Sequence, residues 1–96
     1  MEMKEVYCND RYKVLSVLLN MGEAMPLHHA TSDAFIIGKK GKGKITFADR
    51  QVILSEGDTL LIKANEPHEM EILEDFSSSI ILDHDGRISF DHAMIL

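Results

Sequence analysis

Short runs of strand-forming residues recur along the 96-residue chain, and residues that favour turns end each run. The turns contain Asn, Asp, Gly or Pro, which supply the backbone angles that chain reversals need. No segment keeps apolar residues at helical spacing for the roughly 11 residues that a helix assignment needs. Short strands at this spacing are typical of an all-β sandwich or barrel. The expected strands are Lys4–Cys8, Tyr12–Asn20, Asp33–Lys39, Lys44–Ala48, Gln51–Ser55, Thr59–Ala64, His68–Leu73 and Phe76–Asp83.

Side-chain alternation identifies the inward face of two expected strands, because neighbouring residues of a strand point to opposite faces. In the strand that begins at His68, residues His68, Met70 and Ile72 share the inward face. The strand Tyr12–Leu19 is apolar on both faces, so we expect either a second sheet of the same chain or a partner subunit to cover its outer face. The segment Arg87–Leu96 fits a further strand or a short helical turn.

Length and charge narrow the range of partners. We expect one domain, residues 1–96, and a homodimer, because a domain this small gains burial from self-association. The formal net charge of −6 repels phosphates and anionic membranes, so we expect neither nucleic acid nor membrane as a partner. The single Cys8 cannot form an internal disulfide, and neither a secretion signal nor a bilayer-spanning apolar run is present. We therefore expect a cytoplasmic protein.

Two of the five histidines lie where a barrel of antiparallel strands can bring them together. His28 and His68 each stand at the edge of a strand, after Pro26–Leu27 and after Pro67. Neutral imidazole is a common ligand of divalent Fe, Mn, Zn or Ni, usually in sites with two or three imidazoles and a carboxylate. The other histidines lie beside turns or polar residues, and we expect them to be solvated: His29, His84 and His92.

The residues around this pair resemble the two motifs of the cupin family. The first motif, G-x5-H-x-H-x3-E-x6-G, is matched at Gly22, His28 and Gly41. The second, G-x5-P-x-G-x2-H-x3-N, is matched at Gly57 and His68, with Asn65 at its second glycine. Asparagine tolerates the left-handed backbone better than most residues, so this replacement is mild. The resemblance spans residues 22–72 and implies a small all-β jelly-roll (double-stranded β-helix) cupin barrel.

The sequence departs from the cupin pattern at several positions, including two of the four metal-ligand positions. Ala30 stands at the second histidine, Ala34 at the glutamate, Lys63 at the proline and Ile72 at the asparagine. Of the four ligands that the family uses, His28 and His68 remain. His29 and Asp33 are candidate substitutes, because a β-bulge could turn either side chain inward. A metal site therefore stays one hypothesis among others.

Two alternatives explain the paired histidines without a metal. The imidazoles could pack against Met70 and Phe35, or they could hydrogen-bond to a bound small molecule. The resemblance implies a pocket inside the barrel, and alternation predicts its lining as His28, Ile36, Phe47, His68, Met70 and Ile80.

Two further features carry no chemistry in this interpretation. The basic stretch Lys39–Lys44 lacks the spacing of a phosphate-binding loop and no helix follows it, so we expect a solvated hairpin turn. Cys8 has no base that the sequence identifies, so nucleophilic catalysis has no support.

Three functional hypotheses follow. The first is a protein that binds a small molecule in the barrel pocket without catalysis. The second is a metal-dependent enzyme of the dioxygenase or isomerase type that uses His28 and His68. The third is a structural or regulatory module that acts through dimer contacts. The sequence names no substrate, because the expected pocket residues are generic apolar ones and no cofactor motif is present.

Overall fold

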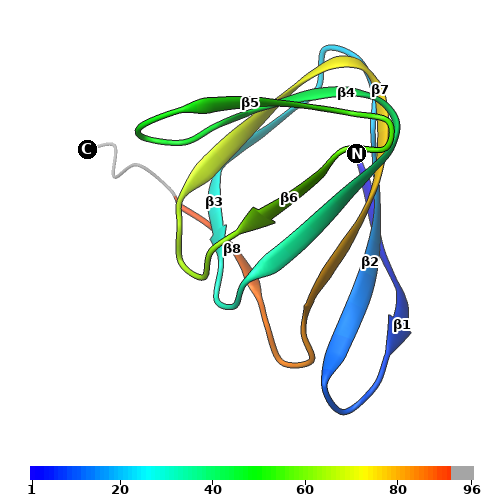
Figure 1. Ribbon diagram of the computed structural model, residues 1–96, viewed down its shortest axis with the longest axis vertical. Coiled ribbons are helices and arrows are strands. Elements are labelled where there is room, and N and C mark those ends of the chain that lie inside the picture. Colours follow the sequence, from blue (N-terminus) through cyan, green and yellow to red (C-terminus); the bar gives the residue numbers. More distant parts are fainter. Residues whose placement is uncertain (92–96) are drawn as a thin grey trace.

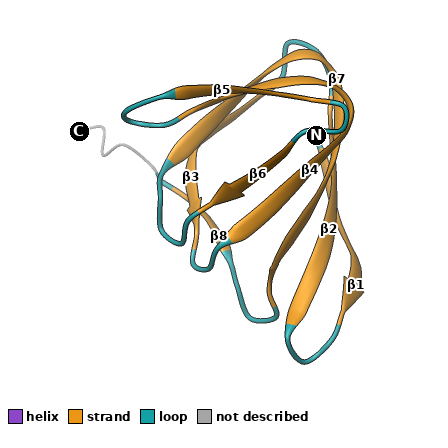
Figure 2. Ribbon diagram, in the orientation of Figure 1, coloured by secondary structure: helices purple, strands orange, loops and turns teal. Residues whose placement is uncertain are grey.

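The computed structural model describes residues 1–91, and within them every regular element is a β-strand. Eight strands form one curled sheet, as Figures 1 and 2 show. They are β1 (Glu2–Cys8), β2 (Tyr12–Leu19), β3 (Ala24–Ala30), β4 (Ala34–Thr46), β5 (Gln51–Ser55), β6 (Thr59–Ile62), β7 (His68–Asp83) and β8 (Ile88–Phe90). The all-β jelly-roll class expected from the sequence is therefore confirmed. The expectation for His92, and the part of the expectation for Arg87–Leu96 that concerns residues 92–96, lie outside the described residues.

The two long strands β4 and β7 connect the two walls of the barrel. Along one half they pair with each other between β2 and β6, and along the other half between β3 and β5. We call the first wall, with β1, β2, β7, β4 and β6, the β1 wall. The second, with β8, β3, β7, β4 and β5, is the β5 wall. Apolar side chains from both walls fill the space between them.

The expected hairpin turn at residues 39–44 is wrong. The chain does not reverse there, because β4 runs through the whole stretch as one bent strand. Register shifts between Gly38 and Gly43 produce the bend against β7, which is likewise continuous rather than two strands. Gly41 has a φ of 79°, and a Cβ there would collide with the carbonyl oxygen of Asp75. The glycines therefore allow β4 to bend from one wall of the barrel into the other.

The sequence prediction contains no strand at β3 and leaves β8 open. β3 contains Pro26, which cannot donate to a ladder, and its pairing with β7 shifts between Met25 and His28. A strand broken in this way has no clean alternation to detect. β8 lies in the segment that the sequence left open between strand and helical turn. Both strands matter here because they carry or cover His28.

Alternation along the other strands follows the prediction. His68, Met70 and Ile72 are buried, and the glutamates between them are exposed. Asn65 adopts a φ of 65°, the left-handed conformation expected at the second motif glycine. The buried core comprises Val17, Leu19, Met25, Ile36, Ile45, Phe47, Leu54, Ile62, Met70, Ile72 and Phe76.

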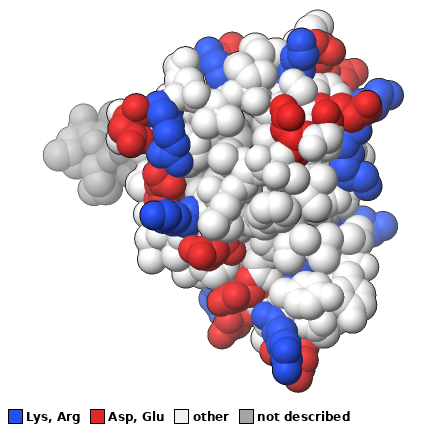
Figure 3. Space-filling model, viewed as in Figure 1, with Lys and Arg blue, Asp and Glu red and all other residues white. Residues whose placement is uncertain are grey.

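The outer face of β2 is uncovered in the single chain. Leu15, Val17 and Leu19 point inward and are buried, whereas Leu18 on the other face is 43% exposed. The expectation that a second sheet of the same chain covers this face is therefore wrong. Figure 3 shows a broad uncharged area over β4 and β6, with charged side chains gathered around it. The described residues include no helix capable of spanning a membrane.

Candidate functional site

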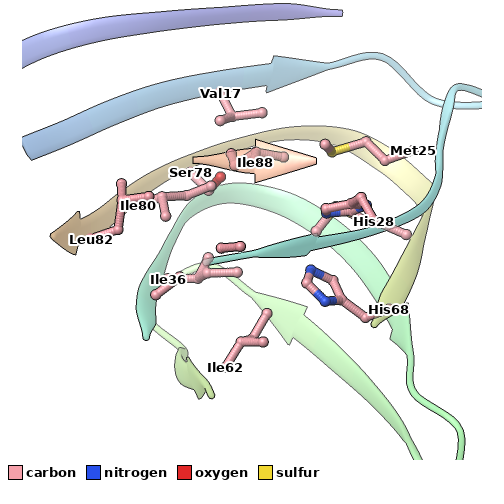
Figure 4. A pocket seen from close by; sticks show the side chains of 13 residues that line it. Val17, Met25, His28, Ile36, Ile62, His68, Ser78, Ile80, Leu82 and Ile88 are labelled. Atoms are coloured by element: carbon pink, nitrogen blue, oxygen red, sulfur yellow. The ribbon is translucent and has the colours of Figure 1, made fainter. Parts of the chain in front are cut away.

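The structure brings His28 and His68 together inside the barrel. The two residues are direct partners in the register between β3 and β7, and each is 5% exposed. Their ring centroids lie 4.2 Å apart, and the rings meet edge to face at 61°. Residues 40 positions apart in the sequence thus form one pair of imidazoles, which Figure 4 shows beside the cavity.

Backbone carbonyls set the proton position on both rings. Nδ1 of His28 lies 2.8 Å from the carbonyl oxygen of Pro26, and Nδ1 of His68 lies 2.9 Å from that of Glu66. A carbonyl oxygen only accepts, so each Nδ1 must carry the proton and donate it. Nε2 of a neutral ring is then an acceptor. Among the described residues, no hydrogen-bond partner of either Nε2 is found, so both acceptors remain available to a bound molecule.

Burial keeps both rings neutral. It lowers the pKa of His28 below the ordinary value of 6.5, and the Pro26 carbonyl opposes this only in part. The pKa of His68 is lowered by burial first, and the neighbouring His28 lowers it further. Because the charged form of each imidazole loses its hydration in the barrel, both rings are neutral at pH 7. The pair is therefore a source of hydrogen-bond acceptors rather than of charge.

The imidazoles line a small apolar cavity of about 30 Å³. One water molecule needs roughly 10–15 Å³, so the cavity holds about two waters, whereas ligand pockets usually measure about 300–1,000 Å³. A molecule larger than water enters only if side chains move. The lining, most of which Figure 4 labels, is Val17, Met25, His28, Ala30, Ala34, Ile36, Ile62, His68, Met70, Ser78, Ile80, Leu82 and Ile88.

A groove of about 460 Å³ lies against this cavity on the outside of the barrel. Met25 and Met70, which are direct partners across β3 and β7, line both the cavity and the groove. Methionine side chains are unbranched and adapt readily to new packing. The two thioethers therefore form the partition through which the groove and the cavity can connect.

The predicted pocket residues divide into two groups. Ile36, Met70 and Ile80 line the cavity together with the histidines. Phe47 is buried but lies outside the lining, and its ring packs 5.6 Å from His68 between centroids. Phe35 points outward and is 38% exposed, so the predicted packing of the histidines against it is wrong. Sequence reasoning missed Phe90, whose ring lies 5.5 Å from His28, because β8 was not assigned.

Neither candidate substitute ligand enters the cavity. His29 is half-buried on the other face of β3, where its Nδ1 lies 2.8 Å from Asp91 Oδ1. Asp33 is exposed, and its Oδ1 accepts a hydrogen bond from the backbone N–H of Ala64. The shift in β3 falls before His28 and turns that residue, not His29, inward. Both candidate ligands are thus engaged outside the cavity.

The donor set does not fit a resident metal ion. Ala30 and Ala34 line the cavity at the motif positions where the family has a histidine and a glutamate, so the backbone aims these positions correctly but the donors are missing. Among residues 1–91, no group of three or more His, Cys, Asp or Glu side chains converges. Protein sites for Fe, Mn, Zn or Ni generally use three or more protein ligands, and two imidazoles fall short of that.

Arg50 anchors the loop that precedes His68. The guanidinium of Arg50 lies 3.7 Å above the ring centroid of Phe47, and its Nη1 donates to Glu66 over 2.9 Å. This hydrogen bond lowers the pKa of the Glu66 carboxyl. Glu66 also supplies the backbone carbonyl that accepts the hydrogen bond from Nδ1 of His68. The ion pair with Arg50 and the hydrogen bond to the imidazole therefore involve the same residue.

Cys8 has a neighbour that the sequence did not reveal. Its Sγ lies 3.4 Å from Nδ1 of His84, which is exposed in the turn after β7, and Cys8 is exposed as well. Neither residue belongs to the cavity lining, and 76 positions separate them in the chain. Only the tertiary fold could show this pairing.

Comparison with known proteins identifies the family of this chain. A profile of the Cupin domain family matches residues 15–83, whereas no protein of curated function matches the chain. A cupin superfamily protein from Desulfitobacterium hafniense superimposes with a TM-score of 0.79 at 21% identity, over 88% of this chain and 77% of that chain. A protein of unknown function from Streptococcus pyogenes gives 0.76 at 18% identity, over 96% and 75%.

An enzyme is also among the similar structures. The DMSP lyase DddQ from Ruegeria pomeroyi superimposes with a TM-score of 0.78 at 15% identity, over 85% of this chain and 44% of that chain. At these identities the likeness concerns the fold, and one fold serves many activities. The family match rests instead on the profile, which covers well over half of the sequence. The chain therefore belongs to the cupin family.

Proposed function

We propose that the protein binds a small, mostly apolar organic molecule in its barrel through the paired imidazoles of His28 and His68, without a resident metal ion. The observation that carries the proposal is the pair of Nδ1 contacts to backbone carbonyls. They use up the donor of each ring and leave two Nε2 acceptors beside an apolar cavity. A ligand that covers these acceptors without donating to them leaves them unpaired at a cost in free energy, so a ligand that donates to them gains selectivity over one that does not.

The chemistry of the lining defines the ligand class. Neutral imidazoles accept from an O–H or N–H group and offer no charge to an anion. The aliphatic side chains around them favour a compact apolar body. A phenol, an alcohol or a protonated acid meets both requirements, whereas a phosphate or a sugar with many hydroxyls leaves polar groups unpaired.

Entry requires the partition of Met25 and Met70 to move. The cavity of about 30 Å³ is too small for such a molecule, but the neighbouring groove of about 460 Å³ has the size of a ligand pocket. A ligand that rests in the groove and displaces the two thioethers reaches the imidazoles. The expected binding is weak for a small probe, because opening the partition offsets part of the burial free energy.

The metal-dependent enzyme hypothesis has less support. A dioxygenase or isomerase of the family type would need donors where Ala30 and Ala34 stand, and His29 and Asp33 are engaged elsewhere. The bound molecule, rather than a metal, is the better partner for the two Nε2 atoms.

Phenol and anisole are matched probes for this proposal, because they share a ring and only phenol has an O–H donor. Long-range ¹H–¹⁵N spectra of the histidine side chains report hydrogen bonding at Nε2. Phenol should shift the Nε2 signals of His28 and His68 with a dissociation constant on the order of 1 mM, and anisole should bind at least about tenfold more weakly. Met70→Leu, which stiffens the partition, should slow the exchange of phenol.

His84→Gln serves as the control, because His84 is exposed and does not line the cavity, and it should leave phenol binding unchanged. His28→Gln should remove it. Equal affinity for phenol and anisole would contradict the role of the acceptors. A stoichiometric transition metal in protein purified without a histidine tag would contradict the metal-free site.

A further inference from the structure

Ser78 is a third polar residue in the lining of the barrel cavity. It lies on β7 between Phe76 and Ile80, which share its inward face, and it is 1% exposed. Within residues 1–91, the other lining residues apart from His28 and His68 carry aliphatic or thioether side chains. Serine is seldom buried in an apolar wall, so this hydroxyl needs a physical explanation.

The hydroxyl of Ser78 has no partner in the part of the chain that the structure describes. No hydrogen bond to or from its Oγ is found there, whereas every described side-chain nitrogen or oxygen that is wholly shielded from solvent has a partner. The residual accessibility of Ser78 therefore lies at Oγ, beside the cavity that the residue lines. Oγ is thus available to a molecule inside the barrel.

Packing does not require this hydroxyl. Ser78 is the direct partner of Val17 on β2 and of Gly38 on β4, and neither offers a polar side chain. Alanine would present the same Cβ to these neighbours without burying an O–H group, which is unfavourable when the group stays unpaired. The adjacent serines, Ser77 and Ser79, point to the outer face and are only half-buried. A guest in the cavity explains the hydroxyl of Ser78 better than packing does.

Ser78 and the imidazoles lie on facing walls of the barrel. Ser78 belongs to the half of β7 that pairs with β2, in the β1 wall, whereas His68 belongs to the half that pairs with β3, in the β5 wall. Facing sheets stand about 10 Å apart. In Figure 4, Ser78 accordingly lies among aliphatic side chains and apart from the two rings. A molecule that contacts both therefore needs two polar groups with an apolar part between them.

We propose that Ser78 is a second polar contact of this site and that the ligand is a two-ended molecule. An O–H or N–H group at one end donates to Nε2 of the imidazoles, and a hydroxyl, carbonyl or ether oxygen at the other end accepts from the Ser78 hydroxyl. The part between the ends is a compact apolar body, because the rest of the lining is apolar. The inference rests on the proposed function, since it concerns the same cavity, and it narrows the ligand class from one polar end to two.

Four small phenols test the second contact: 3- and 4-(hydroxymethyl)phenol against 3- and 4-ethylphenol. Within each isomer pair the phenol group is kept, and a terminal hydroxyl replaces a methyl group of similar size. Titrating the parent and Ser78→Ala, with the Nε2 signals as the readout, gives a cycle that isolates the contribution of the added hydroxyl. Ser78→Ala should weaken the better-binding hydroxymethylphenol about tenfold and change the matching ethylphenol by less than about twofold.

Ser79→Ala is the matched control, because it removes a neighbouring hydroxyl that does not line the cavity. It should change neither affinity. Without a probe, Ser78→Ala should not lower Tm, because its hydroxyl has no protein partner to lose. A fall of about 4 °C or more would assign the hydroxyl to a structural hydrogen bond and would overturn the proposal.

Circular dichroism checks that each variant folds. Should Ser78→Ala fail to fold, Ser78→Cys carries the same test, because it keeps the size of the side chain with a weaker donor. It should weaken the hydroxymethylphenol about threefold.

The outcomes separate this inference from the proposed function. If the ethylphenols shift the Nε2 signals of His28 and His68, but Ser78→Ala weakens both members of each isomer pair equally, the second contact is wrong and the proposed function stands. If no phenol shifts these signals, both are wrong.

The orientation of the bound probe gives an independent test. The benzylic protons of the hydroxymethylphenol should show nuclear Overhauser effects to the Hβ protons of Ser78. The protons beside its phenol O–H should show them to the ring protons of His28 and His68. The reverse orientation would overturn the assignment of the two ends.

Discussion

The β1 wall presents two apolar rows one residue apart, and they have opposite surroundings. The inner row, Leu15, Ile80, Ile36 and Leu60, faces the barrel interior and contributes to the cavity and the core. The outer row faces away from the barrel and lies one residue from the inner row on β2, β7, β4 and β6; its members are Tyr7, Val14, Ile81, Phe35 and Leu61. Hydrophobicity is similar in both rows. The comparison teaches that apolar character alone does not assign a face, because a shift of one residue exchanges the two sides.

The two faces differ in how their polar side chains are arranged. Inside, the polar groups are few, and among the described residues no side-chain nitrogen or oxygen that is wholly shielded from solvent lacks a hydrogen-bond partner. His28 and His68 hold their protons against backbone carbonyls there. Outside, charged groups surround an apolar area. The inside therefore pairs its imidazoles with the backbone, whereas the outside keeps its charges exposed to solvent.

The strongest test of the comparison is truncation on each side of the wall. Ile36→Ala, on the inner row and 3% exposed, should lower the free energy of unfolding by about 2–5 kcal/mol, because the vacated space cannot refill. Leu61→Ala, on the outer row and 50% exposed, should cost less than about 1 kcal/mol in the single chain. Urea unfolding at submicromolar protein measures both. Equal losses would show that the outer row is as much core as the inner row.

The next test adds a missing donor to the inner face. Ala30→His should gain Zn²⁺ or Ni²⁺ binding, because Ala30 lines the cavity beside both imidazoles. Metal at 1,000 times its dissociation constant should raise the free energy of unfolding by about 4 kcal/mol. Thermal unfolding with and without metal measures this, and the parent should respond little. Ala30→Leu, which fills similar space without a donor, should not respond; a metal response of Ala30→Leu would refute the assignment.

Acid should destabilise the protein through the inner face. The pKa of each buried imidazole is lowered from 6.5, so between pH 6.5 and the folded-state pKa the unfolded chain binds more protons than the folded chain. The stabilisation is complete above pH 6.5 and is lost as the pH falls through that range, by up to about 1.4 kcal/mol per pH unit for each histidine. Urea unfolding between pH 7 and pH 5 measures the slope, above the range in which carboxylates titrate.

The variant with both His28→Gln and His68→Gln separates this effect from other acid effects. Glutamine keeps a donor for the backbone carbonyl but does not titrate, so the slope between pH 7 and pH 5 should flatten. An unchanged slope would show that the acid sensitivity does not come from the buried imidazoles.

The smallest effect is expected at the contacts that Arg50 makes with Phe47 and Glu66. Arg50→Ala removes the guanidinium above Phe47 and the ion pair with Glu66, and should lower Tm by only a few degrees, because the pair is exposed to solvent. Lys42→Ala, which removes a more distant surface pair with Glu74, should leave Tm unchanged within error. A larger loss for Lys42 than for Arg50 would show that the stacked ring contributes little.

Much of the fold was predictable because it follows from local patterns. Alternation placed His68, Met70 and Ile72 on the inward face, and the motif spacing paired His28 with His68 although β3 itself was not assigned. The continuity of β4 and β7 was not predictable. Glycines and charges at residues 39–44 have the composition of a turn, but the strand pairing across both walls turns the same residues into a bend.

The candidate site was predictable in its residues but not in its chemistry. Histidine content and spacing indicated the pair, whereas the proton positions depend on the carbonyls of Pro26 and Glu66, and the size of the cavity depends on the packing of both walls. The partition of Met25 and Met70, and the contact of Phe90 with His28, depend on strands β3 and β8 that carry weak local signals.

The amino-acid sequence by itself determined the strand rhythm, the identity of the paired imidazoles and the absence of donors at Ala30 and Ala34, because these are matters of residue type and spacing. Only the tertiary structure decided which of two apolar rows lies inside, how little space the imidazoles enclose, and where each ring holds its proton. These properties depend on register and packing between residues far apart in the chain, and short-range preferences do not encode them.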